Sequence, residues 1–522
     1  MNSPWYNLGL LKENNYQLMW NIKGFLTLGI VSIIAISCNL PTSESIGEVK
    51  QIEFPTPTDQ PHFPFLPTNR APGDSILTPT PDPIRNLPSL RTEAVEYTVQ
   101  ANDTLGEIAN EYGVTLDAVI TENDLVNPDI LSIGQVLIVP PPIPGAPGPN
   151  FKIIPDSELV NGPYNALINL DEFINEMGGY LATYREEVDE ETLSGAEIVI
   201  LVGRNYSVNP RLLLAVLEYQ TGWVTQHQAR LDNLSFPIGF QDPSRNGLYR
   251  QLTWAANNLN LGFYLWRVNG LGYYRTTDGV TIPASPHINA ATAGVQHLFA
   301  QLLDEEGWRL AVSEQGLSQT FQKLFGYPFY WAIEPLLPPD LAQPTLQLPF
   351  ESGIAWTFTG GPHGGWDSGS AWAALDFAPP KDQLGCYPSD EWVVAMADGL
   401  IVRSENGIVV QDLDGDGHEQ TGWVILYMHI ESRDRIPEGT HLMAGERIGH
   451  PSCEGGISSG THVHIARRYN GGWIPADQSI PFVMDGWVSG GNGIPYDGYL
   501  LRGDQKVEPC DGCRDPEHTI QR

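Results

Sequence analysis

The 522-residue sequence has few basic side chains, because 28 Lys and Arg stand against 62 Asp and Glu and give a formal net charge of −34. A chain this acidic lacks the positive surface through which proteins bind nucleic acid or anionic membranes. Charged residues make up only 17%, whereas hydrophobic residues reach 41%, which is enough for globular cores. We therefore expect folded domains, no nucleic-acid partner and, from the acidic surface, a monomer.

Long apolar runs are also scarce, which excludes a polytopic membrane protein. The one candidate, residues 24–37 (GFLTLGIVSIIAIS), follows Lys12 and Lys23 and ends at Cys38. A positive region before a short apolar run is the pattern of an export signal. The residues before Cys38 resemble a bacterial lipobox, which implies that Cys38 is lipidated and becomes the mature N-terminus. An uncleaved anchor is the alternative, and in both cases the rest of the chain lies outside the cytoplasmic membrane, associated with the cell wall.

Cysteine is rare as well: four residues remain after Cys38, an even number that favours disulfides in an oxidising compartment. Four cysteines allow three connectivities, and we expect Cys386 to pair with Cys453 and Cys510 to pair with Cys513. Cys510-x-x-Cys513 is also half of a zinc site, but no second cysteine pair or nearby histidine pair completes it. A disulfide is the better interpretation.

Proline and glycine, by contrast, are abundant and concentrate in segments that divide the chain. Residues 55–88 hold ten prolines without periodicity, and residues 140–149 form a second Pro/Gly-rich spacer. The predicted parts are a signal segment (1–38), a Pro-rich disordered linker (39–92), a first module (93–140), a Pro/Gly linker (141–150), a helical domain (151–338), a C-terminal domain (345–500) and a tail with Cys-x-x-Cys (501–522).

The first module predicts the order strand, helix, helix, strand. Apolar residues at helical spacing from Leu105 predict a helix that ends at Gly113, Thr115 caps a second helix, and residues 136–139 predict a closing strand. The stretch YTVQANDTLGEIANEYGVTLDAVITENDL, followed by NPDILSIGQVLIVP, resembles a LysM module.

The LysM resemblance implies a βααβ fold that binds glycans containing N-acetylglucosamine, such as peptidoglycan, in a groove between two loops. Backbone amides there would bind the acetamido group. A LysM-shaped spacer that no longer binds sugar is the alternative. The implied glycan-binding residues are Asn102, Asp103, Thr104, Leu105, Asn127, Pro128, Asp129 and Ile130.

Residues 151–338 show helical apolar spacing over 167–177, 197–206, 210–219 and 252–268, which predicts a mainly α-helical domain. The stretch YSVNPRLLLAVLEYQTGW (206–223) resembles the start of lytic transglycosylase domains, in which a similar helix ends in a catalytic Glu followed by Ser. Five aromatic residues in this domain have the chemistry to stack on sugars, although such residues more often form core: Trp254, Tyr264, Trp266, Tyr273 and Tyr274.

Gln220-Thr221 occupies the Glu-Ser position of that resemblance, and Gln cannot exchange a proton usefully near neutral pH. Glu218 lies two residues earlier and would point about 200° away around the helix. The resemblance therefore implies a lysozyme-like domain without lytic activity. A glycosidase that uses Glu218 is the alternative.

Histidine gathers towards the C-terminus, because eight of the twelve lie after Ser352. Because residues i and i+2 of a strand share a face, His462 and His464 project to the same side. Two such imidazoles, with a third His and a carboxylate from neighbouring strands, predict a Zn²⁺ site with one position open to water.

Four motifs of this domain, 358–363, 375–378, 427–429 and 458–465, resemble in type and order the lysostaphin and beta-lytic group of zinc metallopeptidases. The long interval between the first His and the Asp favours the beta-lytic branch. The resemblance implies a two-layer antiparallel β-sandwich with the zinc in a groove.

The same resemblance implies that His363, Asp376 and His464 bind Zn²⁺, and that His429 and His462 lie beside the metal and share the proton transfers. The shorter spacing His363-x-x-x-Asp367 also fits the group. We prefer Asp376 because it lies in a strand-like context, whereas Asp367 lies in a Gly/Ser-rich turn.

Three further features of the C-terminal domain are weaker. Residues 412–417 (DLDGDG) resemble the start of a calcium loop, but Trp423 replaces the bidentate Glu at its twelfth position, so a β-hairpin turn with exposed carboxylates is the better interpretation. His441 and His450 lie in loop-rich segments and are expected at the surface.

Together the parts predict an exported zinc metalloendopeptidase that hydrolyses peptide bonds in peptidoglycan stems or cross-bridges, with the LysM module holding it on the polymer. Three alternatives remain open: a non-catalytic cell-wall scaffold or amidase activator, a muralytic glycosidase acting through the middle domain, and a secreted general protease.

Overall fold

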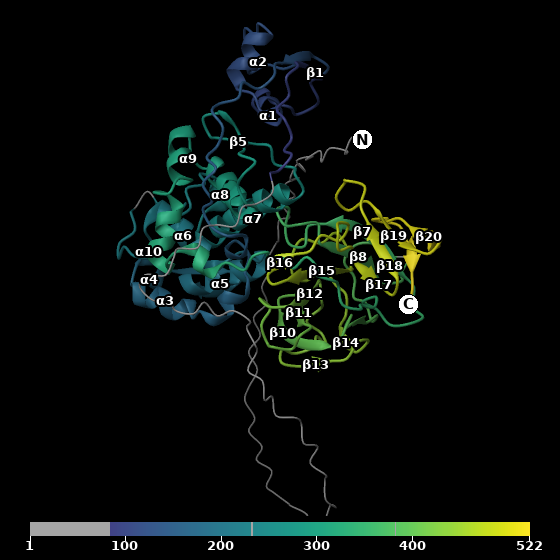
Figure 1. The fold of residues 1–522 in the computed structure, drawn as a ribbon. Helices are drawn as coiled ribbons and strands as arrows, with labels where there is room; N and C mark the ends of the chain where they lie inside the picture. Colours follow the sequence, from purple (N-terminus) through teal and green to yellow (C-terminus); the bar gives the residue numbers. More distant parts are fainter. Residues whose placement is uncertain (1–83, 231–232, 382) are drawn as a thin grey trace, which may run out of the picture. The chain divides into compact units, whose positions relative to one another are not determined.

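The computed structural model describes residues 84–230, 233–381 and 383–522, all within one compact unit (Figure 1). The predicted signal segment, Cys38 and most of the Pro-rich linker lie outside the described residues. Among the residues that are described, no helix is long and apolar enough to cross a membrane.

The first module has the predicted βααβ order. Thr104 caps the first helix through a capping box with Glu107, in which each side chain accepts from the other residue's backbone N–H. The two strands pair antiparallel around a small apolar core. The elements are β1 (Val95–Thr98), α1 (Leu105–Glu111), α2 (Leu116–Glu122) and β2 (Val136–Val139).

The middle region is mainly helical, as predicted, and its lysozyme-like fold stays a prediction. Pro210 opens α6 at the first helical position, where its missing N–H costs nothing, and Gly222 ends it with φ 70°. The helices are α3 (Leu170–Met177), α4 (Tyr180–Thr183), α5 (Gly195–Tyr206), α6 (Pro210–Thr221), α7 (Leu248–Arg267), α8 (Ala290–Ala300), α9 (Glu305–Ala311) and α10 (Leu317–Phe325), with the hairpins β3 (Arg185–Val188)–β4 (Glu191–Ser194) and β5 (Tyr273–Arg275)–β6 (Thr281–Pro283).

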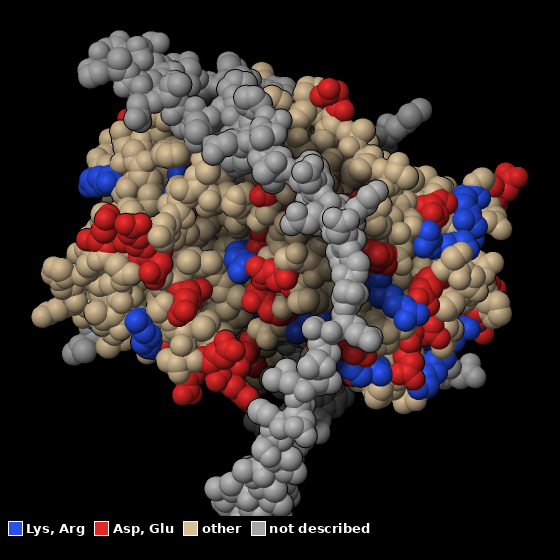
Figure 2. Space-filling model, turned by 90° about the horizontal axis from the view of Figure 1, so that it is seen from below, with Lys and Arg blue, Asp and Glu red and all other residues tan. Residues whose placement is uncertain are grey.

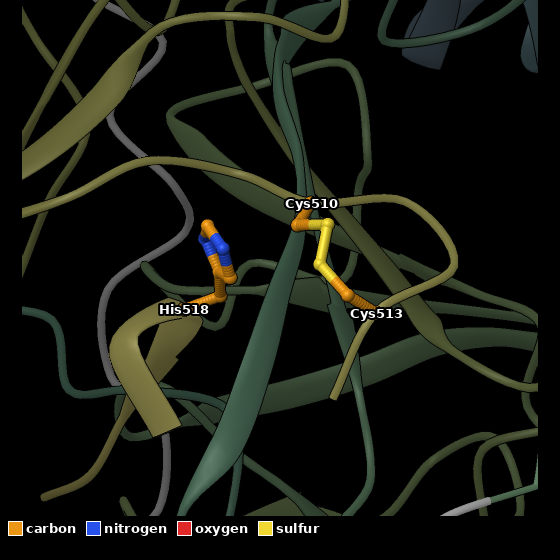
Figure 3. Close-up of side chains that lie close together, drawn as sticks. All are labelled: Cys510, Cys513 and His518. Atoms are coloured by element: carbon orange, nitrogen blue, oxygen red, sulfur yellow. A yellow bond between two sulfur atoms is a disulfide. The ribbon is translucent and has the colours of Figure 1, made fainter. Parts of the chain in front are cut away.

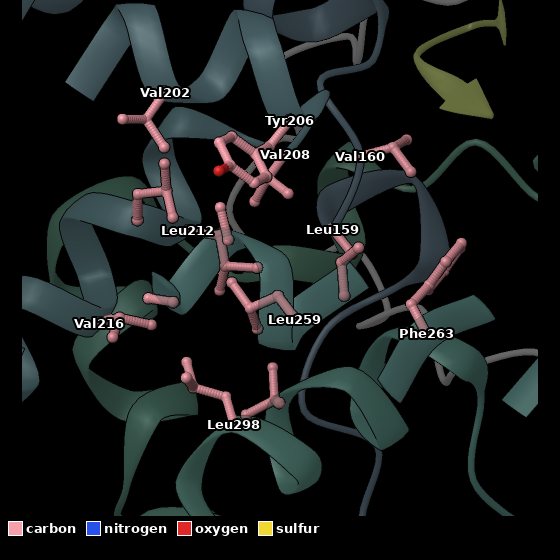
Figure 4. Close-up of a cluster of buried hydrophobic side chains, with 14 of the residues drawn as sticks. Leu159, Val160, Val202, Tyr206, Val208, Leu212, Val216, Leu259, Phe263 and Leu298 are labelled. Carbon is pink, nitrogen blue, oxygen red and sulfur yellow. The ribbon is translucent and has the colours of Figure 1, made fainter. Parts of the chain in front are cut away.

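Apolar side chains from α5, α6, α7 and α8 meet in the core of this region (Figure 4). Leu212 and Val216 of α6 face Leu259 of α7 and Leu298 of α8 in this cluster. Of the five aromatic residues considered for sugar stacking, Trp266, Tyr274 and Tyr264 are buried core residues and Trp254 stacks on Phe240, while Tyr273 keeps 37% of its surface exposed.

The C-terminal domain is built on a nine-stranded antiparallel sheet in the order β13-β10-β11-β12-β15-β8-β7-β21, with β16 paired to β15 (Figure 1). Two smaller antiparallel sheets, β14-β9 and β17-β18-β19-β20, accompany it. The antiparallel architecture is as predicted, and the two-layer sandwich stays a prediction. The bounds are β7 (Trp356–His363), β8 (Ala374–Ala378), β9 (Val393–Val394), β10 (Gly399–Glu405), β11 (Ile408–Asp412), β12 (Trp423–Met428), β13 (His441–Leu442), β14 (Arg447–Gly449), β15 (Val463–Tyr469), β16 (Gly472–Trp473), β17 (Val483–Met484), β18 (Trp487–Gly490), β19 (Tyr499–Arg502), β20 (Gln505–Val507) and β21 (Thr519–Ile520).

The large sheet is buried on both faces, because successive residues of its strands enter different cores. Val410 and Leu426 join the same apolar cluster as the helices of the middle region, whereas Val409, Ile425 and Tyr427 join a second cluster within the C-terminal domain. The helical region therefore packs on one face of the sheet, and the two domains share one core.

A buried ion cluster accompanies this shared core. Glu419, 4% exposed as a side chain, forms salt bridges with Arg204 of α5 (2.7 Å), Arg403 of β10 (3.2 Å) and Arg468 of β15 (2.6 Å). Burial opposes ionisation of Glu419, but the three arginines outweigh it and lower its pKa to about 2.

Buried charges of the two signs balance each other in the described residues. Arg211, Arg403, Arg467 and Arg468 are buried, and so are the acidic side chains Glu158, Asp376, Asp412 and Glu419. On the face shown in Figure 2, carboxylates outnumber basic side chains, and the two signs are interspersed. The expectation, made from composition, that the chain does not bind polyanions stays a prediction.

Candidate metal centre

Three neighbouring strands of the large sheet bring the predicted metal ligands together. His363 ends β7, Asp376 lies in the middle of β8, and His464 is the second residue of β15. Asp376 pairs directly with His464 across the β8–β15 ladder and with Gly360 across the β8–β7 ladder. A Cβ at Gly360 would lie 2.8 Å from Asp376 Oδ2, so this glycine leaves the space that the carboxylate occupies.

The donor atoms of the three side chains form a compact triangle. His464 Nδ1 lies 3.1 Å from both His363 Nε2 and Asp376 Oδ1, and the third side measures 3.4 Å. Tetrahedral Zn²⁺ with bonds of about 2.0–2.1 Å would separate its ligand atoms by about 3.3 Å. The triangle therefore has the dimensions of three corners of a zinc site.

One atom of the triangle is left without a partner inside the protein. Asp376 Oδ1 is buried, and although two imidazole nitrogens lie near it, neither is oriented to donate, so it accepts no hydrogen bond. An unsatisfied buried carboxylate oxygen costs free energy unless something else binds it. With two imidazoles aimed at the same point, the donor set fits a divalent metal.

The outward nitrogens of both histidines are held by backbone carbonyls. His363 Nδ1 lies 2.8 Å from Gly361 O, and His464 Nε2 lies 3.2 Å from Gly365 O. A proton on each outward nitrogen leaves the lone pair on the inward one, which is the tautomer that a metal-ligating histidine needs. The ring of Tyr496 stacks on His363 at 4.1 Å and fixes its plane.

The electrostatics make Asp376 the anionic member of the group. Burial would raise its pKa, but the neighbouring His363 and His462 hold that pKa well below the usual range. Burial likewise opposes a charge on His363, yet the Asp376 carboxylate raises the pKa of that ring. For His464 burial prevails, and its pKa is lowered.

His429 and His462 lie beside the triangle, with ring centroids 4.4 Å apart. His429 Nδ1 is 2.8 Å from Glu454 O and His462 Nδ1 is 2.7 Å from Gly460 O, so each can donate from Nδ1 and keep Nε2 free to accept a proton. His462 Nε2 lies 3.8 Å from Asp376 Oδ1. Burial, together with His462 and His464, lowers the pKa of His429 to about 3, so this ring is neutral at neutral pH.

Asp367, the competing ligand, lies apart from this group. Its φ is 55°, and its carboxylate accepts hydrogen bonds from the Tyr206 hydroxyl of α5 (3.0 Å) and from the Ser368 amide (2.6 Å). It ties the loop after β7 to the helical region. The structure thus brings Asp376, and not Asp367, to the two histidines.

Glu218, the alternative catalytic acid of the middle domain, is engaged in the turn after α6. Its Oε2 accepts from the backbone amides of Val224 (3.0 Å) and Thr225 (3.1 Å), and its Oε1 accepts from the Thr225 hydroxyl (2.6 Å). Gln220, at the position of the family's acid, donates to Ile238 O. Both side chains therefore serve local structure.

Two surface predictions for the C-terminal domain are wrong. His450 is buried, because its ring packs on Trp392 at 3.9 Å and its Nδ1 lies 2.8 Å from Glu391 O; His441 is exposed, as predicted. The β11–β12 loop does form a hairpin, but its first carboxylate, Asp412, is fully buried. Asp412 accepts from the amides of Asp414 and Gly417, which explains the burial of an acidic side chain in a turn.

In the LysM region the implied glycan-binding residues have local structural partners, and sugar binding stays a prediction. Asp103 accepts from the Tyr97 hydroxyl and the Gln100 amide, and Thr104 caps α1. Leu105 is a core residue at 4% exposure, so its side chain cannot pack on a sugar. In the second loop, Asn127 accepts from the Asp129 amide, Ile130 is 68% exposed, and Asn102 and Pro128 lie at loop positions that are at least partly exposed.

Several residues that shape the site were not predicted from the sequence. They are Tyr496 and the carbonyl groups of Gly361, Gly365 and Glu454. Tyr496, Gly365 and Glu454 lie outside the regular strands, whereas Gly361 lies in β7, and a backbone carbonyl carries no side-chain signal. Only the Gly-rich context of Tyr496 (GGNGIPYDG) marks it as a special turn, and its φ of 66° agrees with that.

Comparison with known proteins identifies the parts of the chain. Residues 97–140 match the LysM domain, and residues 152–338 match the N-terminal domain of LasA. Protease LasA of Pseudomonas aeruginosa is 25% identical over 296 residues, which cover 52% of this chain and 65% of LasA. The chain thus spans just under two thirds of that relative.

Two further proteins are similar over shorter stretches. The secreted LysM effector ECP6 of Passalora fulva is 28% identical over 104 residues, 20% of this chain and 43% of the effector. The solved structure of the deep-sea M23 metalloprotease pseudoalterin is 25% identical, with a TM-score of 0.28, and covers 35% of this chain and 100% of that one. The chain therefore contains a region similar to LysM domains and a region similar to the N-terminal domain of LasA, and its likeness to Protease LasA extends over about half of the chain.

Proposed function

We propose that this chain is a zinc metalloendopeptidase that hydrolyses peptide bonds in the stems or cross-bridges of peptidoglycan. The observation that carries the proposal is the triangle of His363, Asp376 and His464, in which a buried carboxylate oxygen has no partner within the protein. The likeness to Protease LasA supports peptide-bond hydrolysis. The LysM match supports a wall glycan as the polymer to which the enzyme binds.

Zn²⁺ held by the three ligands would supply a Lewis acid that polarises the scissile carbonyl and lowers the pKa of a water molecule towards about 7. His429 and His462 are placed to carry the protons. Each has Nδ1 engaged with a backbone carbonyl and Nε2 free, so one ring can take the proton of the attacking water and one can return a proton to the leaving amine. We assign the two roles to the pair jointly.

The remaining parts of the chain would deliver this site to its substrate. Residues 97–140 would hold the enzyme on the glycan and raise the local concentration of scissile bonds without adding contacts at the metal. The proposal includes export through residues 1–38 and lipidation at Cys38.

The structure bears differently on the three alternatives. The complete donor set weighs against a non-catalytic scaffold, because a protein without metal chemistry has no reason to keep an unpartnered buried carboxylate. The three hydrogen bonds to Glu218 weigh against a glycosidase. A general protease shares the same site, and casein digestion separates it from a wall-specific enzyme.

The test is mass spectrometry of sacculi digested by the chain lacking its first 38 residues, with and without a zinc chelator. We expect new peptide termini that disappear with the chelator and in His464→Ala. The matched control is His441→Ala, which removes an exposed histidine of β13 and should cleave like the unaltered chain. Cleaved sugar linkages that survive chelation would overturn the proposal, as would a zinc-loaded chain that yields no products.

A further inference from the structure

The C-terminal tail holds a second group of metal-binding side chains, far in sequence from the first. Cys510 and Cys513 form a disulfide, as predicted, and the ring of His518 lies next to it (Figure 3). One donor atom from each of the three residues lies within 4.8 Å of the others. The sequence alone had left the Cys-x-x-Cys pair without a third ligand, and the fold supplies it.

The position of His518 is fixed in the way that a metal ligand requires. A short helical turn over Pro516–His518 carries the ring, and His518 Nδ1 lies 2.9 Å from the Glu508 carbonyl. Donation from Nδ1 leaves the lone pair on Nε2. A carbonyl therefore engages one ring nitrogen of His518, as carbonyls do for His363 and His464, and Nε2 lies 3.5 Å from Glu517 Oε1.

The local charge distinguishes a metal site from a reactive dithiol. Four carboxylates, those of Glu508, Asp511, Asp515 and Glu517, lie near the cysteines along the chain, against the two cations Arg514 and Lys506, of which Lys506 pairs with Glu508. Negative surroundings raise the cost of a free thiolate, whereas reactive cysteines sit in electropositive sites. The same charges attract a divalent cation, which would itself stabilise the thiolates.

The tail is also attached to the edge of the large sheet at β7. The Cys510 amide donates to Phe358 O of β7 (3.0 Å), and β21 pairs with Trp356 and Thr357 of the same strand. The proximity of Cys510, Cys513 and His518 closes the loop of residues 510–518, which leads directly into β21. The loop therefore contacts β7, the strand whose last residue is His363, one of the three proposed zinc ligands.

We propose that Cys510, Cys513 and His518 form a redox-gated site for a soft divalent metal such as Zn²⁺. In the oxidised chain the S–S bond occupies both sulfurs, and the site is closed. An external dithiol would reduce it: the dithiol gives two electrons and becomes a disulfide, and the Cys510–Cys513 bond breaks to give two thiols. Metal binding then releases both thiol protons and leaves a fourth position for water or a carboxylate.

Cobalt titration of the full chain tests the proposal, because Co²⁺ bound to thiolate gives a sulfur-to-metal charge-transfer absorption. The site at His363, Asp376 and His464 contains no sulfur, so it cannot produce this signal, and the test does not depend on the proposed peptidase activity. We expect the reduced chain to bind one Co²⁺ more than the oxidised chain and to show the absorption. The comparison uses one polypeptide in two redox states, so no variant needs to fold.

Variants then show which residues produce the sulfur-to-cobalt absorption. The Cys510→Ser, Cys513→Ser double variant should lose it, while the matched Cys386→Ser, Cys453→Ser double variant should keep it. His518→Ala should weaken cobalt binding about tenfold or more, and His441→Ala should not. Absorption of equal strength in the oxidised chain, absorption that survives loss of Cys510 and Cys513, or no effect of His518→Ala would each overturn the proposed three-ligand site.

Discussion

Two acidic side chains, Asp376 of β8 and Glu218 of α6, are the candidates for a functional carboxylate in their two domains, and their surroundings differ sharply. Glu218 accepts three hydrogen bonds from Val224 and Thr225, and both of its oxygens are engaged. Asp376 is buried between two imidazoles, and its Oδ1 accepts none. The first carboxylate is explained by the fold around it, and the second is not.

This difference identifies the reactive part of the molecule better than residue type does. A fold stabilises its own carboxylates by supplying donors, as it does for Glu218 at the end of a helix. A buried oxygen that the fold leaves unpaired indicates a partner that is not protein. Substituting each carboxylate by its amide therefore tests the comparison, since the shape stays and only the charge and lone pairs change.

The largest effect is expected for Asp376→Asn. The amide offers the metal a weaker ligand, so we expect zinc content to fall well below one per chain. Loss of metal removes several kcal/mol of transition-state stabilisation, which corresponds to a loss of sacculus-digesting activity of about 10³-fold or more. Metal analysis and product mass spectrometry measure both quantities. Full activity with normal zinc content would show that Asp376 is not a ligand.

A third carboxylate, Glu419, contrasts with Asp376, because it is also buried but forms salt bridges with three arginines. Glu419→Gln would leave Arg204, Arg403 and Arg468 partly uncompensated, and breaking a buried ion cluster in this way costs about 3–5 kcal/mol of unfolding free energy. Urea denaturation measures it. Glu438→Gln, at an exposed position, is the control and should change stability by less than about 0.5 kcal/mol. Equal stability of the two variants would contradict the role assigned to the cluster.

The same cluster predicts a loss of stability in acid. The folded-state pKa of Glu419 is lowered from 4.5 to about 2, so its contribution is fully present above about pH 4.5 and is lost as the pH falls towards 2. Between pH 6 and pH 3 the unaltered chain should lose about 2 kcal/mol more than Glu419→Gln, in which this group no longer titrates. Parallel urea titrations at the two pH values give the difference. Identical losses in both proteins would show that the carboxylate is not held ionised by the arginines.

A smaller effect is expected from the Cys386–Cys453 disulfide, which lies beside the two unliganded histidines. Next to Cys453, Ser452 donates to His429 O (2.7 Å from its amide) and Glu454 O is the partner of His429 Nδ1. The Cys386→Ser, Cys453→Ser double variant should therefore lower kcat about tenfold while zinc content and KM stay near normal, since the disulfide positions His429 and does not bind metal. A loss of zinc in parallel with kcat would assign the disulfide to the metal site instead.

The sequence predicted which side chains meet at the candidate metal centre, because these residues lie in or next to regular structure. At the start of β15 the i, i+2 rule places His464 and the residue just before the strand, His462, on one side, and the apolar residues around Asp376 predict the strand β8. Helices began and ended near their predicted bounds where caps such as Pro210 and Gly222 mark them. Local patterns of this kind survive folding because they arise from the backbone itself.

What the sequence could not predict depends on pairings between distant segments. Glu419 meets Arg204 across 215 residues, and His450 is buried because Trp392 covers it. Neither pairing leaves a periodic trace. The proximity of His518 to Cys510 and Cys513 was also missed, since its distance from Cys513 along the chain does not show that a turn brings it back.

The smallest effect is expected for Glu218→Gln, and this variant tests most directly whether Glu218 is structural and Asp376 functional. The amide of Gln keeps one acceptor oxygen and replaces the other with an NH2 group, which cannot accept. The variant should therefore lose about 1 kcal/mol of unfolding free energy, measured by urea denaturation. Digestion of sacculi should stay within about twofold of the unaltered chain, because both oxygens of Glu218 are engaged by Val224 and Thr225 in the turn after α6. If this variant instead stopped a chelator-resistant cleavage of sugar linkages, hydrogen-bond saturation would no longer separate structural from catalytic carboxylates here, and the chemistry would move to the helical domain.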